Sequence, residues 1–316
     1  MLLSFAPMEG VTSADFRRVH RRLFPEADRY YAPFIAPDAA GRFKQSHLRA
    51  LLPECNEGLA PVPQILCNSS EAFLGAARTL AELGYAEVNL NAGCPSGTVV
   101  GKHKGAGMLG DPAALDVFLD AVFSCSPVAV SVKTRLGLHS AAEFPALLAV
   151  YRRYPLAELI VHARDREGMY RSKPDHAAFA EALVDAPWPV CYNGDIFTAG
   201  DFASLQTEFP TLSRAMLGRG AAVNPALFRV LRGGAPLGRD ELRAFHDALL
   251  DETLAGGLPP VYALARMKEL WSYWIAHFPD SGRLYKALNK SRDLPAYRAA
   301  VSVLFAQTDF DPAGRF

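Results

Sequence analysis

The stretch Asn89–Leu109, NLNAGCPSGTVVGKHKGAGML, contains the features around which the rest of the chain is organised. It begins at the end of an apolar run, Ala86–Asn91, and continues into a glycine-rich, basic segment that holds Cys94 directly before Pro95. Buried structural cysteines normally lie within apolar runs, and this cysteine does not. We therefore interpret the stretch as a strand followed by a catalytic loop, which its glycines and lysines make flexible and electropositive.

Similar apolar, β-branched runs recur along the first 220 residues, and each is followed by a stretch with helical spacing. The candidate strands are Leu2–Met8, Arg29–Ile35, Val62–Leu66, Ala86–Asn91, Val128–Arg135, Glu158–Arg164, Val190–Ile196 and Arg214–Gly218. The candidate helices are Ser13–Leu23, Asp38–Leu51, Ser70–Leu83, Pro112–Phe123, Ala141–Tyr154, His176–Val184, Ala199–Glu208 and Pro225–Leu231. This alternation predicts an α/β fold, a (β/α)8 TIM barrel, because no GxGxxG fingerprint of an open dinucleotide-binding sheet follows the first strand.

The pattern changes after Leu231, where the Gly/Pro-rich segment RGGAPLGRD is typical of a linker. We predict a barrel domain at 1–232, a linker at 233–238 and a small C-terminal α-helical bundle domain at 239–316. The helices expected in this second domain are Arg239–Leu254, Pro260–His277, Gly282–Ser291 and Leu294–Gln307.

The composition is that of an ordinary globular protein and does not by itself indicate a nucleic-acid or membrane partner. Acidic and basic residues balance at 33 each, so any charged surface must be local. The five cysteines form no CxxC pair, which argues against a disulfide framework and a zinc site, and we expect no metal. No apolar run reaches the ~18 residues of a membrane span, and the N-terminus lacks a basic signal region. These features predict a cytoplasmic protein with no membrane partner.

The active site of a (β/α)8 barrel lies at the carboxyl ends of its strands, so the polar residues that end the predicted strands are the candidates. They are Pro7, Met8, Glu9, Gln64, Asn89, Asn91, Cys94, Lys133, Arg135, His162, Arg164, Asn193, Asp195, Gly218 and Arg219. Gly218 and Arg219 precede Gly220 and a helix, which is typical of the phosphate site of such barrels. Gly194, after the seventh strand, would let the backbone approach a ligand closely.

The residues themselves leave the chemistry open at three positions. Lys133 could form a Schiff base, neutralise an anion or be a solvated strand-end lysine. His162 could be structural. A thiol with the reference pKa of about 8.5 is protonated at neutral pH and can act as an acid, whereas cationic neighbours would make Cys94 a nucleophile.

Five motifs together carry a family resemblance. In chain order they are APMEGVTSADFRR, NLNAGCPSGTVVGKHKGAGML, VSVKTRLG, YNGDI and MLGRGAAVNPALF. With these spacings the chain closely resembles the tRNA-dihydrouridine synthases. The resemblance implies an FMN enzyme that reduces the C5=C6 bond of a uridine in tRNA, with NADPH as electron source. It also implies hydride transfer from reduced flavin to C6 and a proton from Cys94 to C5.

The resemblance also implies which residues hold the cofactor. Those expected at the flavin ring, its polar edge, or the ribityl chain and phosphate are Pro7, Met8, Glu9, Gln64, Lys133, His162, Asn193, Gly194, Asp195, Gly218 and Arg219. In the sixth strand the family motif HGRT stands here as His162-Ala163-Arg164-Asp165. The histidine is kept, while the glycine and threonine are lost.

For tRNA, we expect contacts from the barrel mouth and from the helical domain. The candidates for the uracil or its phosphate are Asn91, Lys104 and Arg135. The candidates on the helical domain are Arg283, Lys286, Lys290 and Arg292, a run with no acid among them that would otherwise be a solvated helix face. Further basic residues that could contact RNA are Arg164, Arg166, Arg171 and Lys173.

Three other functions fit part of this pattern. One is a flavin-free phosphate-binding barrel lyase in which Lys133 forms a Schiff base. Another is an FMN-dependent barrel oxidoreductase acting on a small molecule, similar to dihydroorotate dehydrogenase. The third is a non-catalytic tRNA-binding module on a decayed barrel. For the tRNA-modifying enzyme that the resemblance implies, we expect a monomer.

Overall fold

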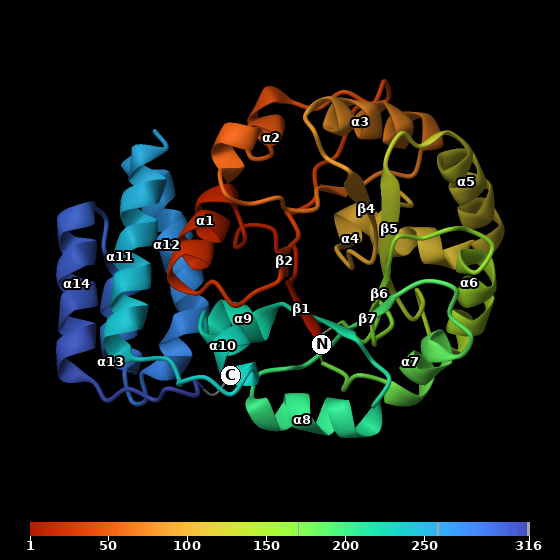
Figure 1. Ribbon diagram of the computed structural model, residues 1–316. Helices are drawn as coiled ribbons and strands as arrows, with labels where there is room; N and C mark the ends of the chain where they lie inside the picture. The colour runs from red at the N-terminus through yellow and green to blue at the C-terminus, as the bar shows by residue number, and fades with distance from the viewer. Residues whose placement is uncertain (170, 258, 315–316) are drawn as a thin grey trace. The chain divides into compact units, whose positions relative to one another are not determined.

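The structure is a computed structural model and describes residues 1–169, 171–257 and 259–314. Within these residues, eight parallel strands form one sheet (Figure 1). They are β1 (Leu2–Phe5), β2 (Arg29–Tyr30), β3 (Gln64–Ile65), β4 (Glu87–Ala92), β5 (Ala129–Arg135), β6 (Leu159–His162), β7 (Val190–Asn193) and β8 (Arg214–Leu217). Their order is β2-β1-β8-β7-β6-β5-β4-β3, and isolated parallel bridges at Tyr31–Val62 and Ile35–Ile65 join its two ends. The predicted (β/α)8 barrel is confirmed.

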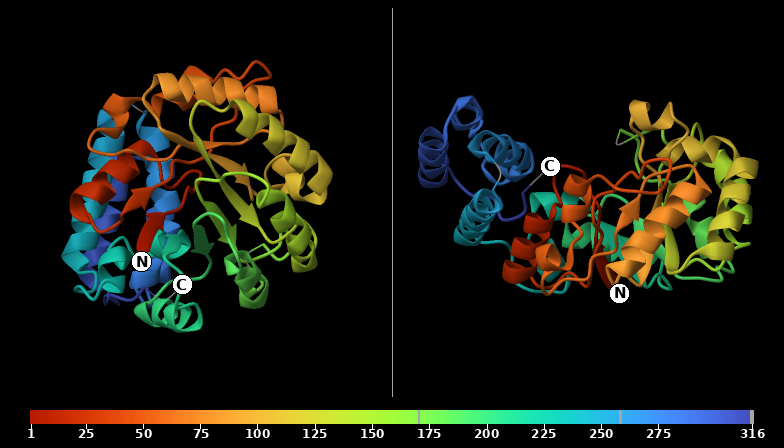
Figure 2. Two further views of the ribbon diagram at one scale, coloured as in Figure 1. Left: turned by 45° about the vertical axis from the view of Figure 1, so that its right-hand side comes forward. Right: turned by 90° about the horizontal axis from the view of Figure 1, so that it is seen from above.

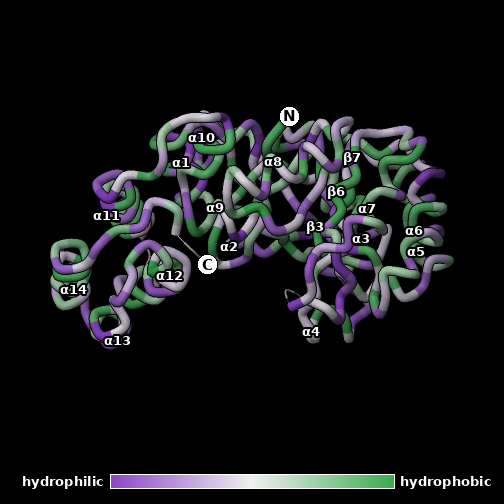
Figure 3. The backbone as a smooth tube through the Cα atoms, turned by 90° about the horizontal axis from the view of Figure 1, so that it is seen from below, coloured by the Kyte–Doolittle hydropathy of each residue, from purple (hydrophilic) through white to green (hydrophobic). Residues whose placement is uncertain are grey.

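The strands form where short apolar runs can be buried. β6, for example, reads LIVH, and all four of its residues are buried. Figure 3 colours the chain by hydropathy and shows such interior strands as green, hydrophobic stretches. The register pairs Asn91 with Lys133, Arg135 with His162, and His162 with Asn193. The polar residues that end these strands therefore lie at one edge of the sheet.

Helices α3 (Ser70–Glu82), α5 (Pro112–Cys125), α6 (Phe144–Tyr151) and α7 (His176–Leu183) cover the outside of these strands (Figures 1 and 2). Capping side chains fix where three of them begin. Ser69, Asp111 and Asp175 each accept a hydrogen bond from the backbone N–H of the third residue after the cap.

The prediction of a helix over Asp38–Leu51 is wrong for its first half, since only α2 (Gln45–Arg49) is helical. Asp38 Oδ1 accepts hydrogen bonds from the backbone N–H groups of Ala40 and Arg42, both at 2.9 Å. Gly41 has a φ of +79° in this turn. The aspartate side chain thus stabilises a turn in competition with a helix.

Helix α10 (Leu227–Leu231) lies within the predicted helix Pro225–Leu231, and a short helix that was not predicted, α9 (Arg219–Val223), precedes it. The predicted helix Ala141–Tyr154 begins with the 3₁₀ segment η3 (Ala141–Glu143), and the α-helical part, α6, follows it. Helix α8 (Ala199–Glu208) has the predicted bounds.

The chain divides into two compact units, each made of more than one segment. The first comprises Met1–Pro7, Arg29–Asp195 and Leu205–Leu217 and contains the whole sheet. The second comprises Met8–Asp28, Ile196–Ser204 and Gly218–Phe316. The boundary at 233–238 stays a prediction, and positions 258, 315 and 316 of the predicted helical domain lie outside the described residues.

The second unit is built on α11 (Arg239–Ala255), α12 (Pro260–Trp274), α13 (Gly282–Lys290) and α14 (Leu294–Gln307), with the short η4 (Ile275–His277) after α12. Trp271 and Trp274 are fully buried between these helices. The hydroxyl of Tyr297 accepts a hydrogen bond from Trp271 Nε1 at 2.9 Å and lies 2.7 Å from His246 Nε2. This aromatic core explains why a stretch without strand-like runs is folded.

Helix α1 (Ala14–Leu23) belongs to this second unit, although it follows the first strand in sequence. Arg18 forms an ion pair with Glu252 of α11 at 2.8 Å, and Asp15 accepts a hydrogen bond from Arg266 of α12. The Arg266 charge and the hydrogen bonds that Asp15 accepts hold the pKa of Asp15 at about 2, against the opposing effect of burial. No helix of the described residues is long and apolar enough to cross a membrane.

Candidate functional site

A chain of buried amides links β3, β4 and β5 at the barrel mouth. Asn91 Nδ2 donates to Gln64 Oε1 at 2.7 Å, Gln64 Nε2 donates to Asn89 Oδ1 at 2.7 Å, and Asn89 Nδ2 donates to Ser131 Oγ at 2.9 Å. All four side chains are less than a tenth exposed. Buried polar groups need such partners, so this network fixes the position of each amide.

The oxygen of Asn91 is the end of that chain, and it holds the loop that carries Cys94. Asn91 Oδ1 accepts from the backbone N–H of Gly93 at 3.1 Å and of Cys94 at 2.9 Å. The backbone N–H of Ala106 donates to the carbonyl of Cys94 at 3.0 Å. The Cys94 side chain is half-buried, and it lies close enough to Lys133 to act on the pKa of that amine. Strand β4 thus delivers a fixed thiol to the barrel mouth.

The interpretation of this segment as a flexible loop needs correction. Residues 97–110 contain the short helix α4 (Gly97–Val100) and the 3₁₀ helix η2 (Gly105–Gly110). A Cβ atom on Gly105 would lie 2.9 Å from the Cβ of Cys94, and one on Gly107 would lie 2.8 Å from the carbonyl oxygen of Val100. The glycines serve close packing here, because a larger residue would not fit.

Lys133 lies at the centre of this mouth. Its Nζ donates to Asn193 Oδ1 at 2.8 Å, and Asn193 Nδ2 donates in turn to the carbonyl of Met216. Burial and then the positive charge of Arg135 lower the pKa of Lys133 to about 7, while the nearby thiols oppose this shift. Across the described residues, no carboxylate forms an ion pair with this amine. A desolvated cation of this kind fits an anionic ligand.

Arg164 is not the exposed RNA contact expected from the sequence, because its side chain is 1% exposed. Its Nε donates to the carbonyl of Ser172 at 2.7 Å, its Nη1 lies 3.3 Å from His162 Nε2, and its Nη2 forms an ion pair with Asp195. His162, Arg164 and Asp195 therefore form one group across β6 and β7. The sequence signal for this group was the spacing of His162 and Arg164 in the predicted sixth strand, since residues i and i+2 of a strand face the same side.

Arg135 was expected to contact the uracil, and its described contacts are to backbone. It is 1% exposed, and its guanidinium donates to the carbonyls of Gly93 at 2.9 Å, Asp165 at 2.9 Å and Met169 at 3.3 Å. Substrate contact by Arg135 stays a prediction. Lys104 is half-buried, and its charge acts on Cys67, whose pKa burial raises to about 12.

The remaining cofactor candidates occupy tight turns. A Cβ atom on Gly194 would lie 2.1 Å from the Tyr192 hydroxyl, so packing alone requires glycine there. Pro7 follows β1 in the first unit.

Four candidates belong to the second unit: Met8, Glu9, Gly218 and Arg219. The backbone N–H of Met8 donates to Thr12 Oγ1 at 2.8 Å, and Glu9 is exposed beside it. Gly218 precedes α9, and the Arg219 guanidinium lies 5.6 Å from the ring centroid of Phe197.

The basic run expected to contact tRNA lies on and after α13. Arg283, Lys286 and Lys290 recur at helical spacing on one face, and all three are exposed, as is Arg292. Across residues 1–169, 171–257 and 259–314, no ion pair neutralises any of the four. The described surface of this helix is therefore a concentrated positive face.

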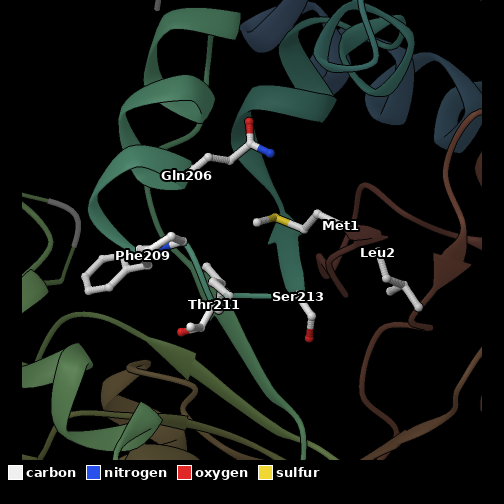
Figure 4. A pocket seen from close by; sticks show the side chains of 8 residues that line it. Met1, Leu2, Gln206, Phe209, Thr211 and Ser213 are labelled. Atoms are coloured by element: carbon white, nitrogen blue, oxygen red, sulfur yellow. The ribbon is translucent and has the colours of Figure 1, made fainter.

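A cavity of about 460 Å³ lies at the opposite end of the barrel, where β1 and β8 begin (Figure 4). Its lining residues are Met1, Leu2, Gln206, Phe209, Pro210, Thr211, Leu212 and Ser213. No acidic, basic or cysteine side chain is among them.

The family model described as "Dihydrouridine synthase (Dus)" matches residues 4–242, which include the end of β1, the whole of β2 to β8 and the thiol loop. The chain belongs to the dihydrouridine synthase family. It is 28% identical to tRNA-dihydrouridine synthase B of Pseudomonas aeruginosa over 99% of this chain and 95% of that protein. It is 33% identical to tRNA-dihydrouridine(16) synthase of Escherichia coli O157:H7 over 72% of this chain and 73% of that protein.

Among solved structures, the old yellow enzyme homologue of Zymomonas mobilis is similar, with a TM-score of 0.52 and 12% identity. The alignment covers 77% of this chain and 92% of that one, and at this identity it supports the barrel fold alone. As a dihydrouridine synthase, the chain has its family match over the barrel, whereas α13 and its basic residues lie beyond residue 242.

Proposed function

We propose that this protein is a tRNA-dihydrouridine synthase that reduces the C5=C6 bond of a uridine in tRNA, with FMN as cofactor and NADPH as reductant. The observation that carries the proposal is the placement of Cys94. Its loop is held by hydrogen bonds to Asn91 at the barrel mouth, and its thiol interacts with Lys133. Family membership supplies the reaction class.

One observation on the barrel mouth, the buried amine of Lys133, fits the binding of an anionic cofactor such as FMN. Lys133 is a buried amine without a carboxylate ion pair in the described chain, so a bound anion would stabilise its charged form. FMN, when bound, supplies the electron pair that reduces C6 of the uracil. We assign Pro7, Gln64, Lys133, His162, Asn193, Gly194 and Asp195 to its binding, with Met8, Glu9, Gly218 and Arg219.

The protein's own residues then have separate tasks. Lys133 holds a positive charge where negative charge develops, which lowers the barrier without moving a proton. Cys94 holds the proton that C5 receives, because a positioned thiol can act as a general acid. Asn91 fixes that thiol through the loop backbone and presents its polar edge to the base. The Arg283, Lys286, Lys290 and Arg292 face binds phosphates of the tRNA.

The alternatives are less well supported. A Schiff-base lyase and a small-molecule flavin oxidoreductase would each leave the family match over the thiol loop unexplained. A non-catalytic RNA-binding module would not need a cysteine held this firmly.

Replacing Cys94 with alanine tests the proposal. We expect the variant to keep its bound flavin and to lose dihydrouridine formation about 10²–10⁴-fold, the usual contribution of a positioned acid. Cys125→Ala is the matched control, since Cys125 is an exposed free thiol elsewhere on the chain. Mass analysis of tRNA nucleosides gives the measurement. Normal dihydrouridine formation by Cys94→Ala would exclude the assigned role.

A further inference from the structure

The backbone from Gly93 to Pro95 is held at each carbonyl by a different donor. Arg135 Nε donates to the carbonyl of Gly93 at 2.9 Å, and the N–H of Ala106 donates to that of Cys94 at 3.0 Å. Arg166 Nε donates to the carbonyl of Pro95 at 3.3 Å. Two arginines from successive strand ends therefore hold the residues on either side of the thiol.

These arginines differ in what their terminal nitrogens do. Arg135 is buried, and its Nη1 is bonded to two backbone carbonyls. Arg166 is half-buried, and within the described chain its guanidinium has one hydrogen-bond partner, the Pro95 carbonyl that Nε reaches, while its backbone N–H donates to Gly137 and its carbonyl accepts from Met169. Its Nη1 and Nη2 are left for a further acceptor.

The neighbouring acids do not neutralise Arg166, since both have other partners. Asp165 Oδ1 accepts from the N–H of Gly168 at 2.6 Å, and Glu167 lies 2.7 Å from His139 Nδ1. Arg171 and Lys173 in the same loop are exposed and form no ion pair with any described residue. The edge of the mouth beside Pro95 is therefore positive and attracts an anion.

We propose that Arg166 is a positioning residue whose terminal nitrogens bind a phosphate of the RNA backbone beside the target uridine, while its Nε holds Pro95. This inference rests on the proposed function. A guanidinium is planar and rigid and binds phosphate through two parallel donors, so a phosphate on its Nη atoms fixes the direction of its Nε. Binding of the correct strand therefore fixes the loop that carries Cys94.

The arrangement also explains why the mouth uses arginine at this position. A base that leaves its stack brings its own phosphates to the edge of the pocket. A lysine would supply a charge for the phosphate but could not hold the loop carbonyl and two phosphate oxygens together in one plane.

Two substitutions separate the charge from the clamp. Arg166→Ala removes both, whereas Arg166→Lys keeps the charge and loses the planar fork. Arg78→Ala, on the exposed face of α3, is the surface control and is expected to match wild type. We would measure tRNA affinity against salt, the single-turnover rate of dihydrouridine formation at saturating tRNA, and the alkylation rate of Cys94 without tRNA.

We expect Arg166→Ala to reduce the slope of log affinity against log salt by about 1. Arg166→Lys should keep the wild-type slope. Both variants should lose about tenfold or more in single-turnover rate, since a small displacement of a catalytic group is costly. Both should also change the alkylation rate of Cys94, because its loop has lost a clamp.

Each readout can overturn the inference. An unchanged salt slope in Arg166→Ala would exclude the phosphate contact. A wild-type rate and wild-type alkylation in Arg166→Lys would exclude the clamp. Absence of dihydrouridine with the wild-type protein would instead refute the proposed function, while the binding and alkylation measurements would still decide the role of Arg166.

Discussion

Replacing Asp195 with alanine should destabilise the protein, because it removes the carboxylate that pairs with the buried guanidinium of Arg164. The Arg164 side chain is 1% exposed and that of Asp195 is 33% exposed, so the substitution leaves a guanidinium buried without its carboxylate. Breaking a buried pair from one side typically costs 3–5 kcal/mol. Because Arg164 keeps its bonds to Ser172 and His162, we expect the lower value, about 3 kcal/mol.

For a chain of 316 residues, this loss corresponds to a fall in melting temperature of about 4–5 °C. The assay is thermal unfolding followed by circular dichroism. The control is Arg298→Ala, which breaks the pair between Arg298 and Asp251, whose side chains are 49% and 66% exposed. A surface pair contributes about 0–1 kcal/mol, so the melting temperature of the control should fall by less than about 2 °C.

The reasoning fails if Asp195→Ala melts within the range of the control. That outcome would mean that water or His162 satisfies the guanidinium without the carboxylate. Asp195→Asn, which keeps an oxygen acceptor but not the charge, should lie between the two.

Three further predictions concern the mouth and the helical unit. The pKa of Lys133 is about 7 in the folded state and about 10.4 in the unfolded state, so between these values the unfolded state binds more protons and the free energy of unfolding rises with pH. Lys133→Met should remove this rise between pH 7 and 9 in melting experiments on the flavin-free protein. Arg283→Glu with Lys286→Glu should weaken tRNA binding and reduce its salt dependence, and equal filter-binding isotherms would remove this face from the binding surface. Gly105→Ala should lower the free energy of unfolding by about 1–3 kcal/mol more than Gly58→Ala in denaturant titrations, because both glycines have positive φ but only the first would crowd a neighbouring side chain.

Much of the barrel could be predicted because its strands obey simple rules. Each strand is an apolar run closed by a polar residue or glycine, and the rule that barrels react at strand ends then selects residues such as Gln64 and Lys133. Helix starts could be predicted where a cap residue precedes a periodic stretch, as at Asp111.

The rest depends on contacts that no local pattern contains. The turn at Asp38 forms because its side chain competes for backbone N–H groups. The burial of Arg164 depends on Asp195, which lies 31 positions away, just after the next strand. Helix α1 joins the second unit through the pair between Asp15 and Arg266, 251 positions apart.

The amide chain at the mouth has a direction, and this constrains how the site can change. Asn91 donates to Gln64, Gln64 donates to Asn89, and Asn89 donates to Ser131, so every side-chain dipole is aligned with the next. Aligned hydrogen bonds reinforce one another. Turning either the Gln64 or the Asn89 amide around alone would leave a donor facing a donor, and replacing either alone with an apolar residue would leave a buried polar atom without its partner. We therefore expect these positions to vary as a set, so that a change in the buried amides of β3 and β4 also affects the loop that carries Cys94.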